Sequence, residues 1–400
     1  MFNNTIAYSA QSSGVGTNVT SSMADQKAAE TNHDRVFVAN ELSNTITVID
    51  ASSNTVEKTI DLTGFDPRPP FAFNASKPPD AMHLTPLYNG AIDIHGMNAS
   101  PDGKIIAVAA RGSSNIYLIN ATSLDRIGPV GGIFVGREPH VPTFTPDGKS
   151  IWVTVRGSNY IATIDINSAL RNQTTFYSEA IPTIDGPSMV WFSNDSKMAF
   201  VGSQKESEMD VIDVAAKTSI AKVDLSQADP KAFSPFVKVT PDGKEVWVVH
   251  KSSDAISAIS TRQPFEIMKT IPLENGSKPN HVEFANHGSK TYAYVTLASV
   301  SPGTNTSKVD VIDTNSNSII GSFDSHGKEA HGIWANPNST RLYVGHEQSP
   351  ILSVFDISSI SNNATNPQLI ASISLGGIEM PNGQTLKSQK SIDVVYTKKS

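Results

Sequence analysis

The sequence contains no cysteine among its 400 residues. Disulfide bonds, thiolate metal sites, iron–sulfur clusters and haem attached through a Cys-x-x-Cys-His motif are therefore excluded. Charge is also sparse, because only 17% of the residues are charged and the net charge is −7. The chain thus lacks the basic surface that non-specific nucleic-acid binding requires, so no nucleic-acid partner is expected. No stretch approaches 18 consecutive apolar residues, so no transmembrane helix is expected either.

The N-terminal segment also lacks a signal-peptide pattern, since it has neither a charged n-region nor an apolar h-region. Residues 1–33 are polar and low in aromatic side chains, which predicts a disordered tail or linker. Their composition is similar to that of a segment directly after a removed signal or anchor.

The motif Asn-x-Ser/Thr occurs at 11 of the 28 asparagines. The Ser and Thr content of the sequence would give about six such motifs by chance. This excess, together with the lack of cysteine and the low charge, predicts an extracellular, cell-surface or periplasmic glycoprotein. One alternative stays open, because Asn, Ser and Thr also gather in turns.

An internal repeat is the main feature that the sequence does contain. Six similar units begin at residues 95, 140, 188, 235, 281 and 331, at spacings of 45, 48, 47, 46 and 50 residues. Segment 35–62 resembles the same unit without its opening strand. Each unit contains four short runs rich in β-branched residues, separated by turn residues such as the Pro-Asp-Gly-Lys of 101–104. Four strands in a unit of this length predict a blade of a β-propeller.

Counting the incomplete unit gives seven blades. The C-terminal segment 390–399 is a strand without a unit of its own, whereas the N-terminal unit lacks a first strand. We therefore expect the C-terminal strand to be the innermost strand of the first blade, which closes the ring and removes exposed sheet edges. The predicted fold is an all-β, seven-bladed β-propeller of four-stranded blades over residues 34–400.

The period, with its Pro-Asp-Gly-Lys, Tyr/Trp-Val and Val-Ile-Asp elements, resembles the YVTN family of seven-bladed propellers. The resemblance covers roughly residues 34–400 and implies the fold. It implies little about function, because this fold serves binding scaffolds and enzymes alike.

Histidines recur at one position of the repeat. The innermost strand lines the central channel, and four of these strands begin with a histidine, at His95, His140, His281 and His331. We call the face where the innermost strands begin the top face. Because adjacent strands of a blade are antiparallel, the second strands end at this face too. These four histidines are predicted metal ligands around the top mouth of the channel.

Further side chains are predicted at the same face. His346 ends a second strand and is a predicted metal ligand, and His250 ends another and is a predicted cofactor-binding residue. His326, in a connection between blades, and His83, in the long Pro-rich insertion 63–94, are also predicted to bind a cofactor; the insertion could act as a lid. Arg111 and Arg156 follow second strands and are predicted to hold an anion or a substrate oxygen. A structural alternative stays open, because duplication can copy a histidine that only hydrogen-bonds a turn.

Several neutral imidazoles at one mouth suit copper first and zinc second. The arrangement is similar to that of nitrous oxide reductases and of haem-d nitrite reductases, which implies a copper centre or, as an alternative, a haem-d-like tetrapyrrole. The chain differs from both in having no cysteine, so a separate electron-transfer protein would have to supply electrons.

Two functions are compatible with this pattern. One is a top-face metal or cofactor site for redox chemistry on a small-molecule ligand, which would make the protein a metal-dependent oxidoreductase. The other is a non-catalytic YVTN-type scaffold at the cell surface, where it binds a cell-wall, glycan or protein partner.

Overall fold

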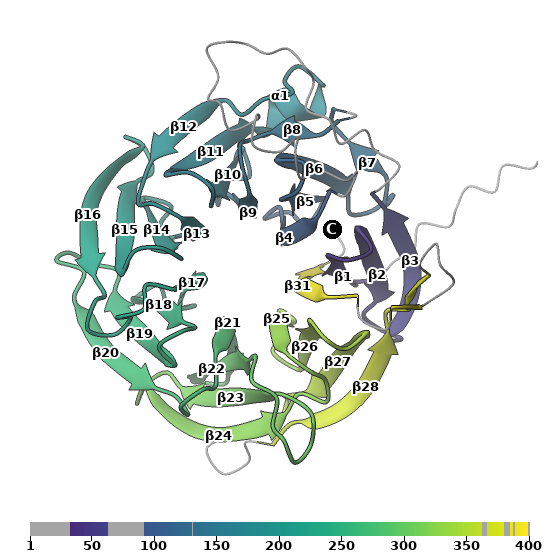
Figure 1. Cartoon of the computed structure of the whole chain (residues 1–400), viewed down its shortest axis with the longest axis vertical. Coiled ribbons are helices and arrows are strands. Elements are labelled where there is room, and N and C mark those ends of the chain that lie inside the picture. The colour runs from purple at the N-terminus through teal and green to yellow at the C-terminus, as the bar shows by residue number, and fades with distance from the viewer. Residues whose placement is uncertain are drawn as a thin grey trace, which may run out of the picture. The chain divides into compact units, whose positions relative to one another are not determined.

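Seven antiparallel sheets are arranged in a ring around a central channel (Figure 1). The structure is a computed structural model that describes residues 33–62, 92–129, 131–361, 366–379, 385–386 and 389–398. The chain divides into two units, Met1–Asn32 and His33–Ser400, and the ring belongs to the second. The predicted tail and the greater part of the insertion 63–94, with His83, lie outside the described residues.

Each blade is a four-stranded meander, and we number the blades along the ring. From the channel outward, blade 1 contains β31 (Ser391–Thr397), β1 (Arg35–Asn40), β2 (Thr45–Asp50) and β3 (Thr55–Asp61). Blade 2 contains β4 (Ile94–Ala99), β5 (Ile105–Ala110), β6 (Asn115–Asn120) and β7 (Arg126–Ile127), and β8 (Ile133–Phe134) also pairs with β6. Blade 3 contains β9 (Pro139–Phe144), β10 (Ser150–Val155), β11 (Tyr160–Asp165) and β12 (Glu179–Pro182).

The other four blades have the same order. Blade 4 contains β13 (Pro187–Phe192), β14 (Met198–Ser203), β15 (Glu208–Asp213) and β16 (Thr218–Asp224). Blade 5 contains β17 (Phe236–Val239), β18 (Glu245–His250), β19 (Ala255–Ser260) and β20 (Ile267–Pro272). Blade 6 contains β21 (Pro279–His287), β22 (Lys290–Leu297), β23 (Lys308–Asp313) and β24 (Ser318–Asp324). Blade 7 contains β25 (Ala330–Ala335), β26 (Arg341–His346), β27 (Ile351–Asp356) and β28 (Gln368–Ser374).

The predicted fold is thus confirmed, including the closure of the ring. Strand β31 from the C-terminus pairs with β1, in a register that opposes Arg35 with Thr397 and Val38 with Val394. The only helix of the described residues is α1 (Ile166–Leu170), and a short hairpin of β29 (Ile378–Glu379) and β30 (Thr385–Leu386) is the only other pair of strands. Within the described ranges, no helix is long and apolar enough to cross a membrane.

The Pro-Asp-Gly-Lys turns connect the first and second strands at the bottom face. In blade 2, Ser100 Oγ and the backbone N–H of Lys104 donate to Asp102 Oδ1 at 2.6 and 3.1 Å. Gly103 has a φ of 71°, a conformation that glycine adopts without steric cost. This local chemistry reverses the chain over residues 101–104, because Ser100 N–H donates to the Ile105 carbonyl, and it therefore sets the register of the two strands.

The hydrophobic core lies between neighbouring blades. Trp152 of blade 3 packs edge-on against Phe192 of blade 4, with ring centroids 5.1 Å apart. Trp247 of blade 5 packs in the same way against Phe284 of blade 6, at 5.4 Å. Innermost strands such as β9 are buried along their whole length, whereas the outer strand β3 exposes all but one of its residues. The side chains at the channel therefore come from well-packed strands.

Candidate functional site

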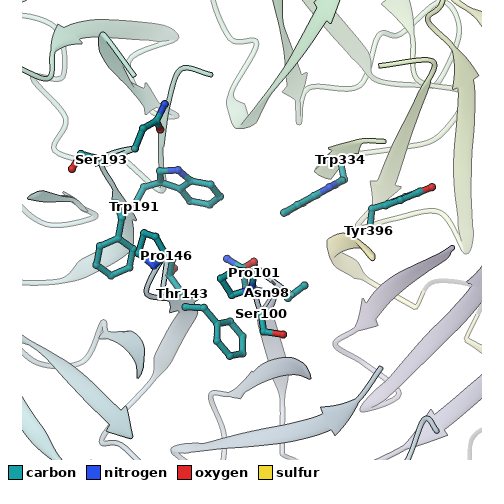
Figure 2. A pocket seen from close by; sticks show the side chains of 13 residues that line it. Asn98, Ser100, Pro101, Thr143, Pro146, Trp191, Ser193, Trp334 and Tyr396 are labelled. Atoms are coloured by element: carbon teal, nitrogen blue, oxygen red, sulfur yellow. Dashed lines mark hydrogen bonds between the residues drawn. The ribbon is translucent and has the colours of Figure 1, made fainter. Parts of the chain in front are cut away.

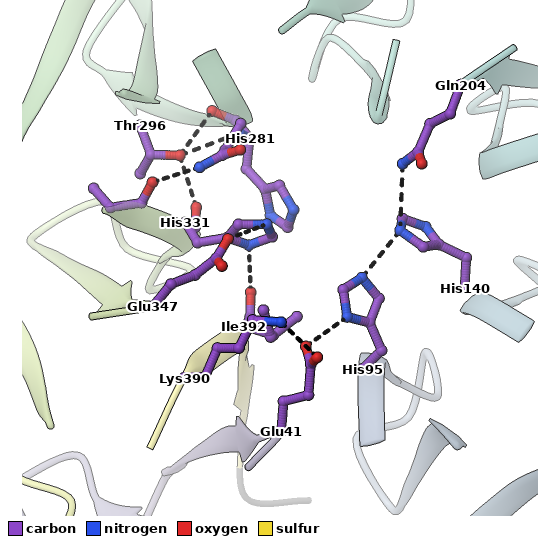
Figure 3. A network of polar contacts seen from close by, with 12 residues as sticks. Glu41, His95, His140, Gln204, His281, Thr296, His331, Glu347, Lys390 and Ile392 are labelled. Carbon is purple, nitrogen blue, oxygen red and sulfur yellow. Dashed lines mark hydrogen bonds and ion pairs between the residues drawn. The ribbon is translucent and has the colours of Figure 1, made fainter. Parts of the chain in front are cut away.

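Four imidazoles meet at the top mouth of the channel, as the repeat predicts (Figure 3). They begin the inner strands of blades 6, 7, 2 and 3, and they form an arc in the order His281, His331, His95 and His140. Successive ring centroids are 4.6, 6.4 and 4.5 Å apart. We call these four side chains the imidazole arc.

Two glycines allow the strands to approach closely enough for these rings to meet. A Cβ on Gly96 would lie 2.2 Å from the carbonyl oxygen of His140, and one on Gly332 would lie 2.8 Å from the Cα of Asp393. Neither position has space for a side chain. The His-Gly pairs at 95–96 and 331–332 therefore combine a ligand-type side chain with a close contact between neighbouring blades.

His95 and His140 face one another through their Nε2 atoms, which are 3.0 Å apart. On the far side of each ring, Nδ1 meets a fixed acceptor. His140 Nδ1 donates to the carbonyl oxygen of Ser188 at 2.5 Å, and His95 Nδ1 lies 3.2 Å from Glu41 Oε2. A neutral imidazole carries one N–H, and acceptors at Nδ1 hold that proton there. With this tautomer at both residues, the two Nε2 atoms carry no proton and lie 3.0 Å apart, and the side-chain amide nitrogen of Gln204 lies 3.5 Å from His140 Nε2.

The other two imidazoles differ from this pair. His331 Nδ1 donates to the carbonyl oxygen of Ile392 at 2.7 Å, and its Nε2 lies 3.3 Å from Glu347 Oε1. His281 stacks on Phe236 with ring centroids 4.2 Å apart. In the described part of the chain, the ring nitrogens of His281 have no hydrogen-bond partner.

Burial keeps the arc uncharged. It lowers the pKa of His95 and of His140 well below 6.5, and the positive charge of Arg111 adds to this effect at His95. Burial likewise lowers the pKa of His281, and it lowers that of His331 to about 3. All four imidazoles are therefore neutral near pH 7, the form that binds metal ions.

A ring of polar and charged side chains surrounds the arc, and we call it the outer ring. Its members come directly after the second strand of their blades, the repeat position that predicted Arg111 and Arg156. It consists of Glu41, Arg111, Arg156, Gln204, Lys251 and Glu347.

Ion pairs hold most of the outer ring in place. Glu41 accepts from Arg111 at 2.5 Å and from Lys390 at 2.6 Å, besides its contact with His95. Arg156 pairs with Glu138 at 3.4 Å and donates to Gln204 at 3.2 Å. Lys251 differs from these residues, because its ammonium group has no hydrogen bond or ion pair within the described residues.

The remaining predicted histidines lie outside the arc. His250 is fully buried in blade 5, where its ring nitrogens bond Ser234 Oγ and Ser257 Oγ, both at 2.8 Å. His346 is fully buried as well, and its ring nitrogens lie 3.2 and 3.1 Å from backbone carbonyl oxygens of Ile351 and Ser325. His326 is exposed, with its ring 6.0 Å from that of Phe355. His83 lies outside the described residues.

Sequence reasoning missed Glu41, Gln204, Lys251 and Lys390. The signal for the first three was available, because they share the repeat position of Arg111 and Arg156. Among the residues that the structure describes, no three His, Asp or Glu side chains gather closely enough to form a complete metal site. The imidazole arc therefore provides two nitrogen ligands in contact, those of His95 and His140, and a bound ion would need further ligands from outside the protein.

Comparison with known proteins supports the fold. The model of the family described as "Lactonase, 7-bladed beta-propeller" matches residues 128–263, about a third of the chain. A search of curated protein sequences finds no match.

Three solved structures resemble the chain at low sequence identity. Hydrazine synthase of Kuenenia stuttgartiensis is 16% identical, with a TM-score of 0.60 over 77% of this chain and 96% of that chain. A protein of unknown function from Desulfotomaculum acetoxidans is 15% identical, with a TM-score of 0.63 over 92% of this chain and 100% of that chain. The dihydro-heme d1 dehydrogenase NirN in complex with DHE is 13% identical, with a TM-score of 0.55 over 85% of this chain and 73% of that chain. Together these matches identify the chain as a seven-bladed β-propeller.

Proposed function

We propose that the top mouth of the channel holds a metal ion, copper or zinc, between His95 and His140, and that a small molecule completes its coordination. One observation carries this proposal: the Nε2 atoms of His95 and His140 lie 3.0 Å apart in a buried site, while Nδ1 of each ring faces an acceptor. With the proton of each ring on Nδ1, the two unprotonated nitrogens repel at this distance, and a cation that contacts both relieves the repulsion. A proton is disfavoured in that place, because burial and the nearby Arg111 lower the pKa of the His95 imidazole.

The donor set fits copper or zinc. Imidazole nitrogen is a preferred ligand of both ions, and metal–nitrogen distances of about 2.0–2.1 Å let two donors 3.0 Å apart share one ion. Glu41 and the Ser188 carbonyl then act as the partners that orient the two rings. The bound ion would act as a Lewis acid, and copper could also accept or donate one electron.

The outer ring favours a ligand that carries oxygen or negative charge. The Lys251 ammonium group is without an ion pair in the described part of the chain. Along the outer ring, Gln204 comes between Lys251 and Arg156, and it accepts a hydrogen bond from Arg156. Arg111 is already paired with Glu41 and with Asp93, so its role is to position Glu41 and, through it, His95. If copper cycles between oxidation states here, a separate electron-transfer protein delivers the electrons.

A haem-d-like tetrapyrrole is the second candidate. It is favoured by the similarity of fold to NirN, a protein described as a dihydro-heme d1 dehydrogenase. Arg156 and Lys251 could bind the carboxylates of such a group, and an imidazole of the arc could reach its metal. His95 and His140 are too close together to ligate one tetrapyrrole metal from opposite faces, which is why we place this candidate second.

Metal analysis of the purified protein tests the proposal. After loading with copper or zinc and removal of excess ion, we expect one ion per chain. His95→Ala and His140→Ala should each lower the affinity by at least about 100-fold, more than the loss of an orienting partner costs. His287→Gln is the matched control, because His287 lies at the opposite end of the strand that carries His281.

Three outcomes are distinguishable. Sub-stoichiometric metal in every preparation, with no thermal stabilisation by added ion, contradicts the metal site and favours a non-catalytic surface scaffold. A haem absorption band that appears on titration with a tetrapyrrole and is lost in Lys251→Met supports the second candidate. Equal metal content in the wild type and both histidine variants contradicts the assignment of the ligands.

We also propose an extracellular, cell-surface or periplasmic location, which the sequons support. Five of them are at exposed positions, namely Asn172, Asn194, Asn275, Asn305 and Asn338. Asn98 is only 8% exposed, so this sequon is not accessible in the folded protein.

A further inference from the structure

The bottom mouth of the channel contains a cavity of about 360 Å³ (Figure 2). It lies where the inner strands end, at the opposite end of the channel from the imidazole arc. Its size is within the range of about 300–1,000 Å³ typical of small-molecule sites. The site proposed for the top mouth does not use it.

Two indoles face this cavity from opposite sides. Trp191 lies near the end of β13 in blade 4 and Trp334 near the end of β25 in blade 7, and both are half-buried (Figure 2). Tryptophans in the two inner strands of a blade are expected to pack against neighbouring residues of the core. Trp152 and Trp247 do so and are 2% and 0% exposed, whereas Trp191 and Trp334 expose indole surface to the channel.

A buried ion pair holds these indoles in place. Lys238 Nζ lies 4.9 Å from the ring centroid of Trp191 and 4.7 Å from that of Trp334. The ammonium group is itself fixed by Glu283 at 2.7 Å, and both partners of this pair are more than nine-tenths buried. Cation–π contacts of this kind keep the two aromatic platforms in a fixed orientation before any ligand binds.

Polar groups with unused hydrogen-bonding capacity also border the cavity. Asn98 is nine-tenths buried, and its Oδ1 accepts the N–H of Ala99 at 2.8 Å, which directs its Nδ2 to the other side. In the described part of the chain, neither this amide NH₂ nor the N–H of Trp191 or Trp334 has a hydrogen-bond partner. These donors are open to solvent rather than buried, so an oxygen of a bound molecule can replace the water that reaches them.

The lining is uncharged. None of the described residues that border the cavity is Asp, Glu, Lys, Arg or His. At the rim, the Asp-Gly-Lys turns carry pairs that neutralise each other, such as Asp147 with Lys149 at 3.2 Å. A charged ligand would lose its hydration there without gaining a partner of opposite charge. The cavity therefore favours a neutral ligand with an apolar face for the indoles and oxygen atoms for the donors.

We infer that the bottom mouth is a binding site for a neutral saccharide, in which a pyranose ring stacks on Trp191 or Trp334 and its oxygens accept hydrogen bonds from Asn98 and the indole N–H groups. A pyranose combines a flat C–H face with closely spaced hydroxyl oxygens, and these are the two features that the lining matches. The site is independent of the metal proposed at the top mouth.

Isothermal titration of the full chain tests this site with four probes: methyl β-glucoside, methyl β-galactoside, N-acetylglucosamine and cellobiose. Three comparison ligands are used: benzoate, which is negatively charged, choline, which is positively charged, and benzyl alcohol, which is neutral and aromatic. We expect at least one sugar to bind saturably, and about tenfold or more tighter than every comparison ligand.

Variants then locate the binding. Trp191→Leu or Trp334→Leu should weaken the binding of that sugar by about tenfold or more, and Asn98→Ala, a smaller change to the fold, should weaken it several-fold. Tyr160→Phe is the control and should leave the binding unchanged, because Tyr160 packs on Tyr177 away from the residues that line the cavity. Failure of all four sugars to bind, tighter binding of a comparison ligand, or equal affinity in the three cavity variants would each overturn the inference.

Discussion

Asp393 shows how a single residue can make the stability of the ring depend on pH. Its carboxyl group is buried in the channel, where Oδ2 accepts the N–H of Met97 and Oδ1 accepts the N–H of Val394, both at 2.9 Å. Burial raises its pKa from 3.8 to about 7, and the hydrogen bonds from the Met97 and Val394 N–H groups, with the charge of Lys238, only partly oppose this shift. The folded protein therefore keeps a proton that the unfolded chain has already released between these two pH values.

We expect the contribution of Asp393 to stability to fall as the pH rises from about 4 to 7, while the buried histidines, whose pKa values are lowered, contribute in the opposite direction. A group whose folded pKa is raised stabilises the fold fully below its unfolded pKa, and this contribution is lost as the pH passes through the folded pKa. The limiting slope for one proton is about 1.4 kcal/mol per pH unit. Asp393→Asn removes this contribution, so the variant should be less stable than the wild type at pH 5, by about 1 kcal/mol through a lost hydrogen bond, and should gain stability relative to the wild type as the pH rises to 8. Urea unfolding at pH 5, 6, 7 and 8 measures both effects, and parallel curves for the two proteins would contradict the prediction.

Among the structural elements, β31 has a special position, because it is the last strand in the sequence and the innermost strand of the first blade. It contributes three apolar side chains that are fully or nearly fully buried, those of Ile392, Val394 and Val395. Its first residues also reach the top mouth, where the Ile392 carbonyl accepts from His331. The strand therefore both closes the ring and orients one imidazole of the arc.

Deletion of residues 391–400 should prevent the ring from closing. Strand β1 would lose its inner partner and expose an apolar edge, which favours association. We expect aggregation or a large fall in melting temperature, measured by size-exclusion chromatography and circular dichroism. A synthetic peptide of residues 388–400, added during refolding, should restore part of the monomeric fold because it supplies the missing strand. A truncated protein that melts like the wild type would contradict this role.

For the ring as a whole, the packing between blades suggests that the blades unfold together. Apolar layers join blade 1 to blade 2, blade 3 to blade 4 and blade 7 to blade 1, and a larger layer extends across blades 4, 5 and 6. Among the described residues, no blade has a core of its own that is separate from its neighbours. Weakening one layer should therefore affect all seven blades.

Phe284→Ala tests this cooperativity, because Phe284 packs on Trp247 between blades 5 and 6. Loss of a buried aromatic ring costs about 3–5 kcal/mol, and we expect a lower melting temperature with one transition. Tryptophan fluorescence, which reports on blades 3, 4, 5 and 7, and circular dichroism, which reports on all strands, should give the same midpoint. Two separated transitions would show that groups of blades unfold independently.

The repeat by itself determined the number of blades, their four strands, the closing strand and the places of His95, His140, His281 and His331. These features depend on turn chemistry and the alternation of side chains within about 46 residues, and both are local properties that recur in each copy. The same reasoning could also have found the outer ring, since Glu41, Lys251 and Glu347 share one repeat position.

Only the tertiary structure decided what the side chains at those positions do. His250 and His346 end second strands at the top face, yet their ring nitrogens bond nearby hydroxyl and carbonyl groups, while His95 and His140 bring their Nε2 atoms to 3.0 Å from each other. Trp191 and Trp152 both look like packing residues in the sequence, but only Trp152 is covered by a neighbouring ring. These differences depend on contacts between blades, in which the partner is dozens of residues away and differs from copy to copy. A pattern shared by all copies carries no information about such contacts, because they arise where the copies differ.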